Sequence, residues 1–167
     1  MVDNTLENWT WASQPAAAGP CIVVDVDGVI ADGWHRQHYL RDGRRDWKSF
    51  FADAGGDSPI AGSVALVEQL GAAATLVLLT ARPHGVRDTT LEWLAEHGYR
   101  WDLLIMRRRS DGGLSSPDFK RRSVEELRAA GLMPVLAFDD DQRNVDMFRS
   151  AGIETLYVHS GYYDDEV

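Results

Sequence analysis

The sequence is poor in the features that mark secreted, membrane-spanning or nucleic-acid-coating proteins. Its single cysteine, Cys21, excludes an intramolecular disulfide and fits a reducing cytoplasm, where we expect the protein to act. No apolar run approaches the roughly 20 residues of a membrane helix, and the first residues lack the basic-then-apolar order of a signal peptide. Acidic residues (26) outnumber Lys and Arg (17), and the formal net charge of −9 argues against non-specific coating of nucleic acid. A local basic cleft remains compatible with that charge.

The sequence does contain enough apolar residues, 44% of its 167, to form one domain with a buried core. Residues 1–19 show no sustained hydrophobic period and end in a turn-rich stretch, so we interpret them as an N-terminal arm or linker before a domain at 20–167. Trp9 and Trp11 of this arm are predicted to pack on the domain or on a neighbouring subunit. The sequence leaves the oligomeric state open.

Short apolar runs alternate with longer amphipathic segments from residue 20 onward. The runs cover residues 21–26, 75–80, 102–106, 134–138 and 154–158. They lack polar alternation, which is typical of strands buried on both faces. Three of the helix-period segments between them stop at Gly98, Gly131 and Gly152, each shortly before a strand. This order predicts an α/β fold, a Rossmann-like five-stranded parallel sheet with helices on both faces.

An insertion at residues 30–60 separates the first expected strand from the first clear helix, and it is too long for a simple loop of about 2–6 residues. Its position after a strand's carboxyl end is where ligands bind in open α/β sheets, so we predict a small cap. Its basic residues are Arg36, Arg41, Arg44, Arg45 and Lys48, and its aromatic residues include Trp34, Tyr39, Trp47, Phe50 and Phe51. The aromatic side chains either pack under the insertion or offer a stacking surface for a base.

Polar side chains follow three of the expected strands at their carboxyl ends. They are Asp25 and Asp27 after the first strand, Thr80, Ala81 and Arg82 after the second, and Asp139, Asp140 and Asp141 after the fourth. Because parallel strands end at one edge of a sheet, these groups should converge in one crevice, together with Lys120 from the helix before the fourth strand. Carboxylates that face one another are costly unless a cation lies among them, and oxygen ligands favour Mg²⁺. Thr80 and the backbone N–H groups after it can hold phosphate oxygens, and Lys120 supplies countercharge.

The motifs VVDVDGV, VLLT, Lys120 and LAFDDD, in this order, resemble those of the haloacid dehalogenase-like superfamily of phosphohydrolases, from Cys21 to about Tyr163. The resemblance implies that Asp25 attacks phosphorus and becomes an aspartyl-phosphate. It implies that Asp27 protonates the leaving oxygen, then activates the hydrolytic water, and marks a phosphatase rather than a dehalogenase. It also implies Mg²⁺ bound by the Asp25 carboxylate, the Asp27 backbone carbonyl and Asp139, with Asp140 close by.

Residues 118–158 more closely resemble the phosphatase domain of polynucleotide kinase–phosphatases, which remove 3′-phosphates from nucleic-acid ends. Ala81-Arg82 stands where that family has Gly-Arg, which implies that Arg82 contacts the substrate phosphate or the acidic site. Residues 107–109 are three arginines where the family also has basic residues, and we take Arg109 as the candidate substrate ligand, although the sequence does not say which of the three faces the site. Two departures are the absence of a Gly-x-x-x-x-Gly-Lys-Ser/Thr motif and the presence of Asp141 where the family has arginine.

The expected function is a magnesium-dependent phosphatase that hydrolyses phosphomonoesters of nucleotides or of nucleic-acid 3′-phosphate ends. The alternatives are a promiscuous small-molecule phosphatase or, in a different class, a non-catalytic metal- or phosphate-binding domain or a receiver-like signalling domain. A receiver carries its phospho-accepting aspartate at the third strand, where this sequence has Arg107. A binding module would tolerate the loss of Asp27 or Lys120, and both are present.

Overall fold

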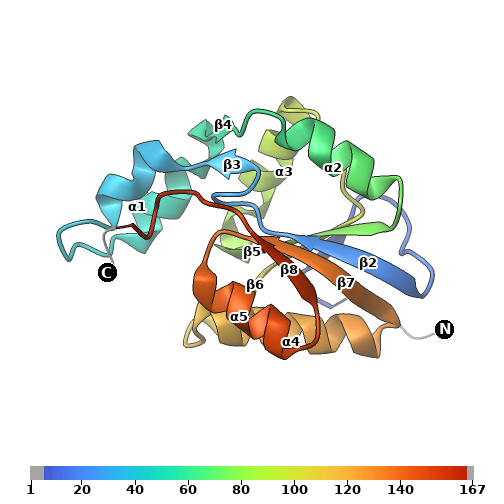
Figure 1. The fold of residues 1–167 in the computed structure, drawn as a ribbon. Coiled ribbons are helices and arrows are strands. Elements are labelled where there is room, and N and C mark those ends of the chain that lie inside the picture. The colour runs from blue at the N-terminus through green and yellow to red at the C-terminus, as the bar shows by residue number, and fades with distance from the viewer. Residues whose placement is uncertain (1–5, 165–167) are drawn as a thin grey trace.

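Five parallel strands form the centre of the structure, a computed structural model that describes residues 6–164. They are β2 (Gly19–Val24), β5 (Thr75–Pro83), β6 (Leu103–Arg107), β7 (Leu132–Asp139) and β8 (Glu154–Tyr157). Their order in the sheet is β6-β5-β2-β7-β8, and every neighbouring pair is parallel (Figure 1). Each strand coincides with one of the five apolar runs, so the predicted α/β sheet is confirmed. The first of them, β2, lies at the middle of the five.

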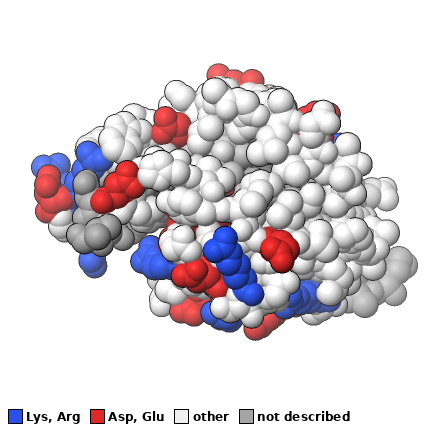
Figure 2. Space-filling view, in the orientation of Figure 1, with Lys and Arg blue, Asp and Glu red and all other residues white. Residues whose placement is uncertain are grey.

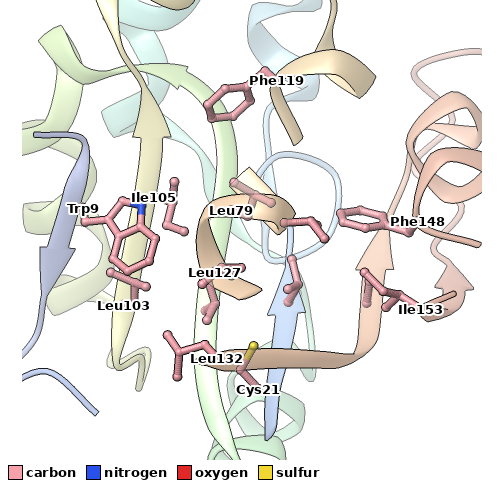
Figure 3. Close-up of a cluster of buried hydrophobic side chains, with 14 of the residues drawn as sticks. Trp9, Cys21, Leu79, Leu103, Ile105, Phe119, Leu127, Leu132, Phe148 and Ile153 are labelled. Carbon is pink, nitrogen blue, oxygen red and sulfur yellow. The ribbon is translucent and has the colours of Figure 1, made fainter. Parts of the chain in front are cut away.

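A sixth strand, β1 (Trp9–Trp11), pairs antiparallel with β6 at the edge of the sheet. Trp9 is buried and packs beside Leu103 and Ile105 (Figure 3). The arm therefore docks on the domain of its own chain, which was one of the two predicted alternatives. The strand itself was not predicted, because three residues are too few to show a hydrophobic period.

Helices cover both faces of the sheet, and alternate residues of each strand point to opposite layers. Cys21 and Val23 of β2 pack in the cluster that includes Phe119, on the side of α4 (Ser116–Ala129) and α5 (Gln142–Ser150). Ile22 and Val24 pack in the other cluster, on the side of α2 (Ser63–Gly71) and α3 (Arg87–Glu96) (Figure 1). Within residues 6–164, no helix combines the length and apolar character needed to cross a bilayer.

Three glycines end helices as predicted. The backbone of Gly98, Gly131 and Gly152 adopts φ values of 69°, 83° and 75°, the left-handed conformation that glycine reaches without a steric penalty. Each turns the chain from a helix toward the next strand of the parallel sheet.

The insertion forms a small cap at the end of the sheet where β2 and its neighbours finish (Figure 1). Its base is the antiparallel pair β3 (Ala31–Asp32) and β4 (Ser58–Pro59), which encloses the 3-10 helices η1 (Trp34–Tyr39) and η2 (Asp53–Gly56) and the helix α1 (Trp47–Ala52). Two further 3-10 turns, η3 (His84–Val86) and η4 (Arg109–Asp111), follow β5 and β6. Near the end of the described chain, the Tyr162 hydroxyl accepts a hydrogen bond from the Gly33 N–H at 2.6 Å, which fastens the C-terminal segment to the cap.

Candidate active site

The turn after β2 brings two carboxylates to the edge of the sheet. The Asp25 N–H donates to the Phe138 carbonyl at 3.0 Å, and the Val26 carbonyl then accepts the N–H of Ala31 at 2.9 Å, which closes a tight turn. Gly28 lies in this turn with φ 76°, and a Cβ built there would lie 2.0 Å from Asp140 Oδ2. Only glycine fits, because any side chain would collide with the neighbouring acid.

Asp25, Asp139 and Asp140 converge at this edge, as the parallel topology predicted. Each offers a carboxylate oxygen, and these oxygens lie within 4.8 Å of one another. Lys120 of α4 joins them: its Nζ lies 2.7 Å from Asp25 Oδ2 and 2.6 Å from Asp139 Oδ2, with only 1% of its side chain exposed. The second oxygen of Asp139 accepts hydrogen bonds at 3.0 Å from the Asp141 N–H and from Asn144 Nδ2. Asn144 was not predicted as a site residue.

Three carboxylates surround one ammonium group here, and the pKa values of two of them, Asp25 and Asp140, are raised. Burial raises the pKa of Asp25 well above its ordinary value; Lys120 opposes the shift and Asp139 adds to it. Burial also raises the pKa of Asp140 to about 7, against a hydrogen bond from Ser160 and with a further contribution from Asp139. Burial acts to lower the pKa of Lys120, but the attraction of Asp139 and Asp25 raises it overall. The lysine is therefore charged, and the raised pKa values of Asp25 and Asp140 indicate that one ammonium group does not offset their burial and mutual repulsion.

This cluster suits a hard divalent cation. Asp140 Oδ2 is buried and has no hydrogen-bond partner among the residues that the structure describes. A buried carboxylate oxygen without a partner is costly, and a cation at this position would satisfy it. All the donors are oxygens, which is the chemistry that Mg²⁺ prefers. Asp25, Asp139 and Asp140 thus fit a metal site through their side chains.

The carboxylate of Asp27 points away from this cluster and toward two buried arginines. Arg82 Nη2 lies 2.7 Å from Asp27 Oδ1, and Arg36 Nη2 donates to the same oxygen. Both guanidinium groups also contact Asp57, with Arg36 Nε at 2.7 Å from Oδ1 and Arg82 Nη2 at 2.7 Å from Oδ2. Two arginines and two aspartates therefore alternate in one network that links the cap, the turn after β2 and the end of β5.

Arg36 and Asp57 were not predicted as site residues. Arg36 is one of five basic residues in the insertion, and nothing in its spacing distinguishes it from the others. Asp57 lies at the far end of the insertion, outside every recognised motif. The one general indication in the sequence is that the insertion contains both acids and arginines and directly follows the turn that carries Asp25 and Asp27.

The two arginines keep Asp27 ionised. Burial acts to raise the pKa of its carboxyl, but the charges and hydrogen bonds of Arg82 and Arg36 outweigh burial and lower the pKa to about 2. The two aspartates of the Asp-Val-Asp-Gly turn therefore have pKa values shifted in opposite directions. Such a separation is typical of paired acids with different roles.

The other predicted side chains lie around the cluster in different settings. Thr80 is buried, and its hydroxyl accepts the Arg82 N–H at 3.2 Å. Ala81 lines the main cleft, whereas the Arg82 side chain is fully buried against Asp27 and Asp57. Asp141 caps α5 by accepting the Arg143 N–H at 2.9 Å.

Of the three consecutive arginines, Arg107 lines the main cleft and donates to the Leu114 carbonyl at 2.7 Å. Arg109 is exposed and lies on a smaller pocket of about 330 Å³. The two pockets adjoin, because both are lined by Pro83, Gly85 and Arg107.

The main cleft has a volume of about 1200 Å³ and runs from the carboxylates to the cap. Asp25, Asp27 and Asp140 lie at one side of it. The cap contributes Arg45, Trp47, Lys48, Phe50 and Phe51, and the C-terminal segment contributes Tyr162 and Tyr163. Figure 2 shows Lys and Arg side chains, mixed with acids, at the end of the molecule where the cap lies. The cleft thus combines an acidic centre with a cationic and aromatic wall.

The family model described as the polynucleotide kinase PNKP phosphatase domain matches residues 19–163. Among curated protein sequences, none matches the chain significantly.

Solved structures with the same fold include a chain of the Pnkp1/Rnl/Hen1 RNA repair complex, at 22% identity and a TM-score of 0.67, covering 90% of this chain and 45% of that one. A chain of a second Pnkp1/Rnl/Hen1 complex is 21% identical, with a TM-score of 0.69 and coverage of 90% and 49%. The class C acid phosphatase of Bacillus anthracis with tungstate bound is 14% identical, with a TM-score of 0.62 and coverage of 89% and 69%. The present chain spans about half the length of the two chains of these complexes that it matches.

Proposed function

Because the chain belongs to the family of polynucleotide kinase PNKP phosphatase domains, within the haloacid dehalogenase-like superfamily, we propose that it hydrolyses phosphomonoesters of nucleotides or of nucleic-acid 3′-phosphate ends with the help of Mg²⁺. The observation that carries the proposal is the group of three buried carboxylates around Lys120, open to a cleft of about 1200 Å³. Phosphoryl transfer needs a nucleophile, charge neutralisation and room for the ester, and this site offers all three.

Asp25 is the proposed nucleophile. Its carboxylate lines the cleft, and its contact with Lys120 Nζ at 2.7 Å holds the side chain in one orientation. The attacking oxygen forms a bond to phosphorus while the bond from phosphorus to the leaving oxygen breaks, which leaves an aspartyl-phosphate on the enzyme. Lys120 opposes the rise in the pKa of Asp25 that burial causes, and so favours the ionised carboxylate that this attack needs.

Asp27 is the proposed acid and base. In the hydrolytic step its ionised carboxylate accepts a proton from the water that attacks the aspartyl-phosphate, which releases inorganic phosphate and regenerates Asp25. Donating a proton to the leaving oxygen requires the protonated form. We expect that step to need Asp27 to lose an arginine contact, since Arg82 and Arg36 hold its pKa at about 2.

Magnesium would be held by the carboxylates of Asp25, Asp139 and Asp140, together with the Asp27 backbone carbonyl that the resemblance implies. Its chemistry would be to neutralise negative charge on the transferring phosphoryl group.

The remaining groups would bind and orient the substrate. Thr80, the Ala81 N–H and Lys120 are proposed to contact the phosphoryl oxygens, and Arg107 adds positive charge on the cleft wall. Arg82 is fully buried, so we propose that it positions Asp27 rather than reaching substrate. Because the smaller pocket adjoins the cleft, Arg109 would serve only a substrate long enough to extend beyond the cleft.

The proposed organisation follows from these positions. We propose a catalytic domain at 20–167 with residues 30–60 as the cap over the cleft, preceded by an N-terminal arm at 1–19 whose described part includes β1.

The test is phosphate release in the presence of Mg²⁺, with a 3′-phosphorylated oligonucleotide, the matching 3′-mononucleotide and p-nitrophenyl phosphate as substrates. We expect release from the nucleic-acid end to exceed release from the small ester. Comparable rates on all three would favour a promiscuous phosphatase, and no release from any of them would refute the proposal.

Asp25→Asn and metal chelation provide the controls. The substitution is nearly isosteric and should abolish turnover, because an amide is a poor nucleophile toward phosphorus. EDTA should silence the wild-type protein, and added Mg²⁺ should restore it. Residual wild-type rates in Asp25→Asn would exclude Asp25 as the nucleophile.

A further inference from the structure

The aromatic side chains of α1 divide into a buried part and an exposed part. Phe50 is buried, and the Arg36 guanidinium lies over its ring at 4.1 Å from the centroid. Trp47 is 52% exposed and lines the same cleft as Asp25. Packing under the insertion therefore accounts for Phe50 but not for Trp47.

The exposed ring of Trp47 is held in place from one side. It stacks on Phe51 with centroids 5.9 Å apart and an angle of 24° between the planes, and it meets the edge of Phe50 at 5.7 Å. The helix begins at a defined point, because the Asp46 side chain accepts the Ser49 N–H at 3.1 Å. A fixed aromatic ring beside open space can stack on a flat ligand with little loss of conformational entropy.

Positive charge accompanies this ring, although the chain as a whole carries −9. Arg45 and Lys48 flank Trp47 in sequence and line the same cleft, and Arg107 lies on the β6 side of it. Arg45 has φ 47°, a left-handed conformation that is costly for a non-glycine residue. Aromatic and cationic groups together are the chemistry that recognises the bases and phosphates of nucleic acid.

The cleft has room for more than a phosphate group. Its volume of about 1200 Å³ exceeds the roughly 300–1,000 Å³ of pockets for drug-sized ligands. A nucleoside attached to the phosphate at Asp25 can therefore occupy the part of the cleft that the cap lines.

We propose that Trp47 stacks on the base of the phosphate-bearing terminal nucleotide of a nucleic-acid strand, while Arg45 and Lys48 attract the strand's next phosphate. The inference rests on the proposed function and specifies its substrate: a nucleotide unit with a base, rather than a base-free phosphate ester. Stacking reads no hydrogen-bond pattern, so the four bases should be accepted at similar rates.

The test compares the KM of variants for a 3′-phosphorylated dinucleotide and for glycerol 2-phosphate, which carries no ring. Trp47→Ala should raise KM for the dinucleotide about 5- to 140-fold, the equivalent of the roughly 1–3 kcal/mol of one base–aromatic stack. Its KM for glycerol 2-phosphate should stay within about twofold of wild type, because the ester does not reach the ring. Trp47→Phe should restore most of the loss for the dinucleotide.

Trp34→Ala is the matched control. Trp34 is a cap tryptophan with 51% exposure, but it stacks on Tyr162 and does not belong to the described lining of the cleft. Its removal should leave KM for both substrates unchanged. Trp47→Leu keeps apolar bulk without the aromatic face, so it should fold even where alanine does not, and it should still lose affinity for the dinucleotide.

A second readout does not depend on turnover. In the Asp25→Asn protein, the 3′-phosphorylated dinucleotide should quench tryptophan fluorescence, and Trp47→Phe in that background should remove most of the quenching. Two outcomes would overturn the stacking proposal if wild type removes the 3′-phosphate of the dinucleotide. In the first, Trp47→Ala and Trp47→Leu leave the KM for the dinucleotide unchanged. In the second, they raise the KM for glycerol 2-phosphate by the same factor as the KM for the dinucleotide. Absence of phosphate release from every ester by wild type would instead refute the proposed function, and the stacking proposal with it.

Discussion

Replacing Lys120 by methionine should destabilise the protein by about 3–5 kcal/mol, the range measured when one partner of a buried ion pair is removed. The structure indicates why. At an effective dielectric constant of about 20, contacts of 2.7 and 2.6 Å each correspond to about 6 kcal/mol of attraction. The desolvation of the ammonium group offsets several kcal/mol of this sum. In the variant, Lys120 no longer balances the repulsion among Asp25, Asp139 and Asp140, and this unbalanced repulsion destabilises the native state.

The loss should depend on pH in a defined direction. Burial already raises the pKa of Asp25 and Asp140 above their ordinary values, and removal of Lys120 should raise them further. Between the ordinary and the raised pKa values of these acids, the native state then binds more protons than the unfolded state, so its stability falls as pH rises through that window. The lysine of the wild type has a raised pKa, so its contribution is fully present at both pH 5 and pH 8. The difference between variant and wild type should therefore be larger at pH 8.

The assay is thermal unfolding in EDTA at pH 5 and pH 8, with Arg121→Met as the control, since Arg121 is an exposed neighbour on the same helix. At about 2–4 °C per kcal/mol for a chain of this size, the expected fall in Tm at pH 8 is about 6–20 °C. The reasoning is refuted if Lys120→Met lies within about 1 kcal/mol of wild type at pH 8, or loses more at pH 5.

Three smaller predictions concern other parts of the site and core. Asp57→Asn removes one of the two carboxylates that neutralise the buried Arg36 and Arg82, and should lower the free energy of unfolding, measured with urea, by about 3 kcal/mol. His35→Ala is the control: its partly exposed ring lies 3.0 Å from the same carboxylate, and its loss should lower that free energy by less than about 1 kcal/mol. Gly28→Ala should lower Tm and remove most phosphatase activity, since its Cβ would collide with Asp140 and its φ of 76° disfavours a side chain; an active, equally stable variant would contradict the turn geometry. Burial raises the pKa of Cys21 to about 12, so a thiol reagent should label it only as fast as the protein unfolds, and rapid labelling of native protein would show an accessible thiol.

The central sheet could be predicted because its inner strands β2, β5 and β6 are largely buried on both faces and read as short apolar runs. The expectation of burial on both faces was wrong for the edge strand β8, where three of four residues are exposed. The convergence of Asp25, Asp139 and Asp140 could be predicted for a related reason, since parallel strands end at a common edge. Neither inference needs to know which side chains are neighbours in space. The topology alone places the acids together.

The parts that escaped prediction depend on particular contacts. The pairing of Arg36 and Arg82 with Asp57 is decided by how the cap folds back, and a sequence with many charged residues offers many equivalent partners. Among three adjacent arginines, the direction of each side chain follows from where β6 ends, which placed Arg107 on the main cleft and Arg109 outside its described lining. The strand β1 is too short to have a period of its own.

The strand β1 lies outside the family boundary but belongs to the folded sheet. The match to the family starts at residue 19, yet Trp9 is part of the buried cluster, and the backbone of β1 pairs with β6 along that edge. A protein trimmed to the family boundary would lose a core tryptophan and leave the outer edge of β6 unpaired. An open edge of this kind can recruit a strand from another molecule. The ten residues before Gly19, which read as a linker in the sequence, therefore cover this edge of the sheet through β1.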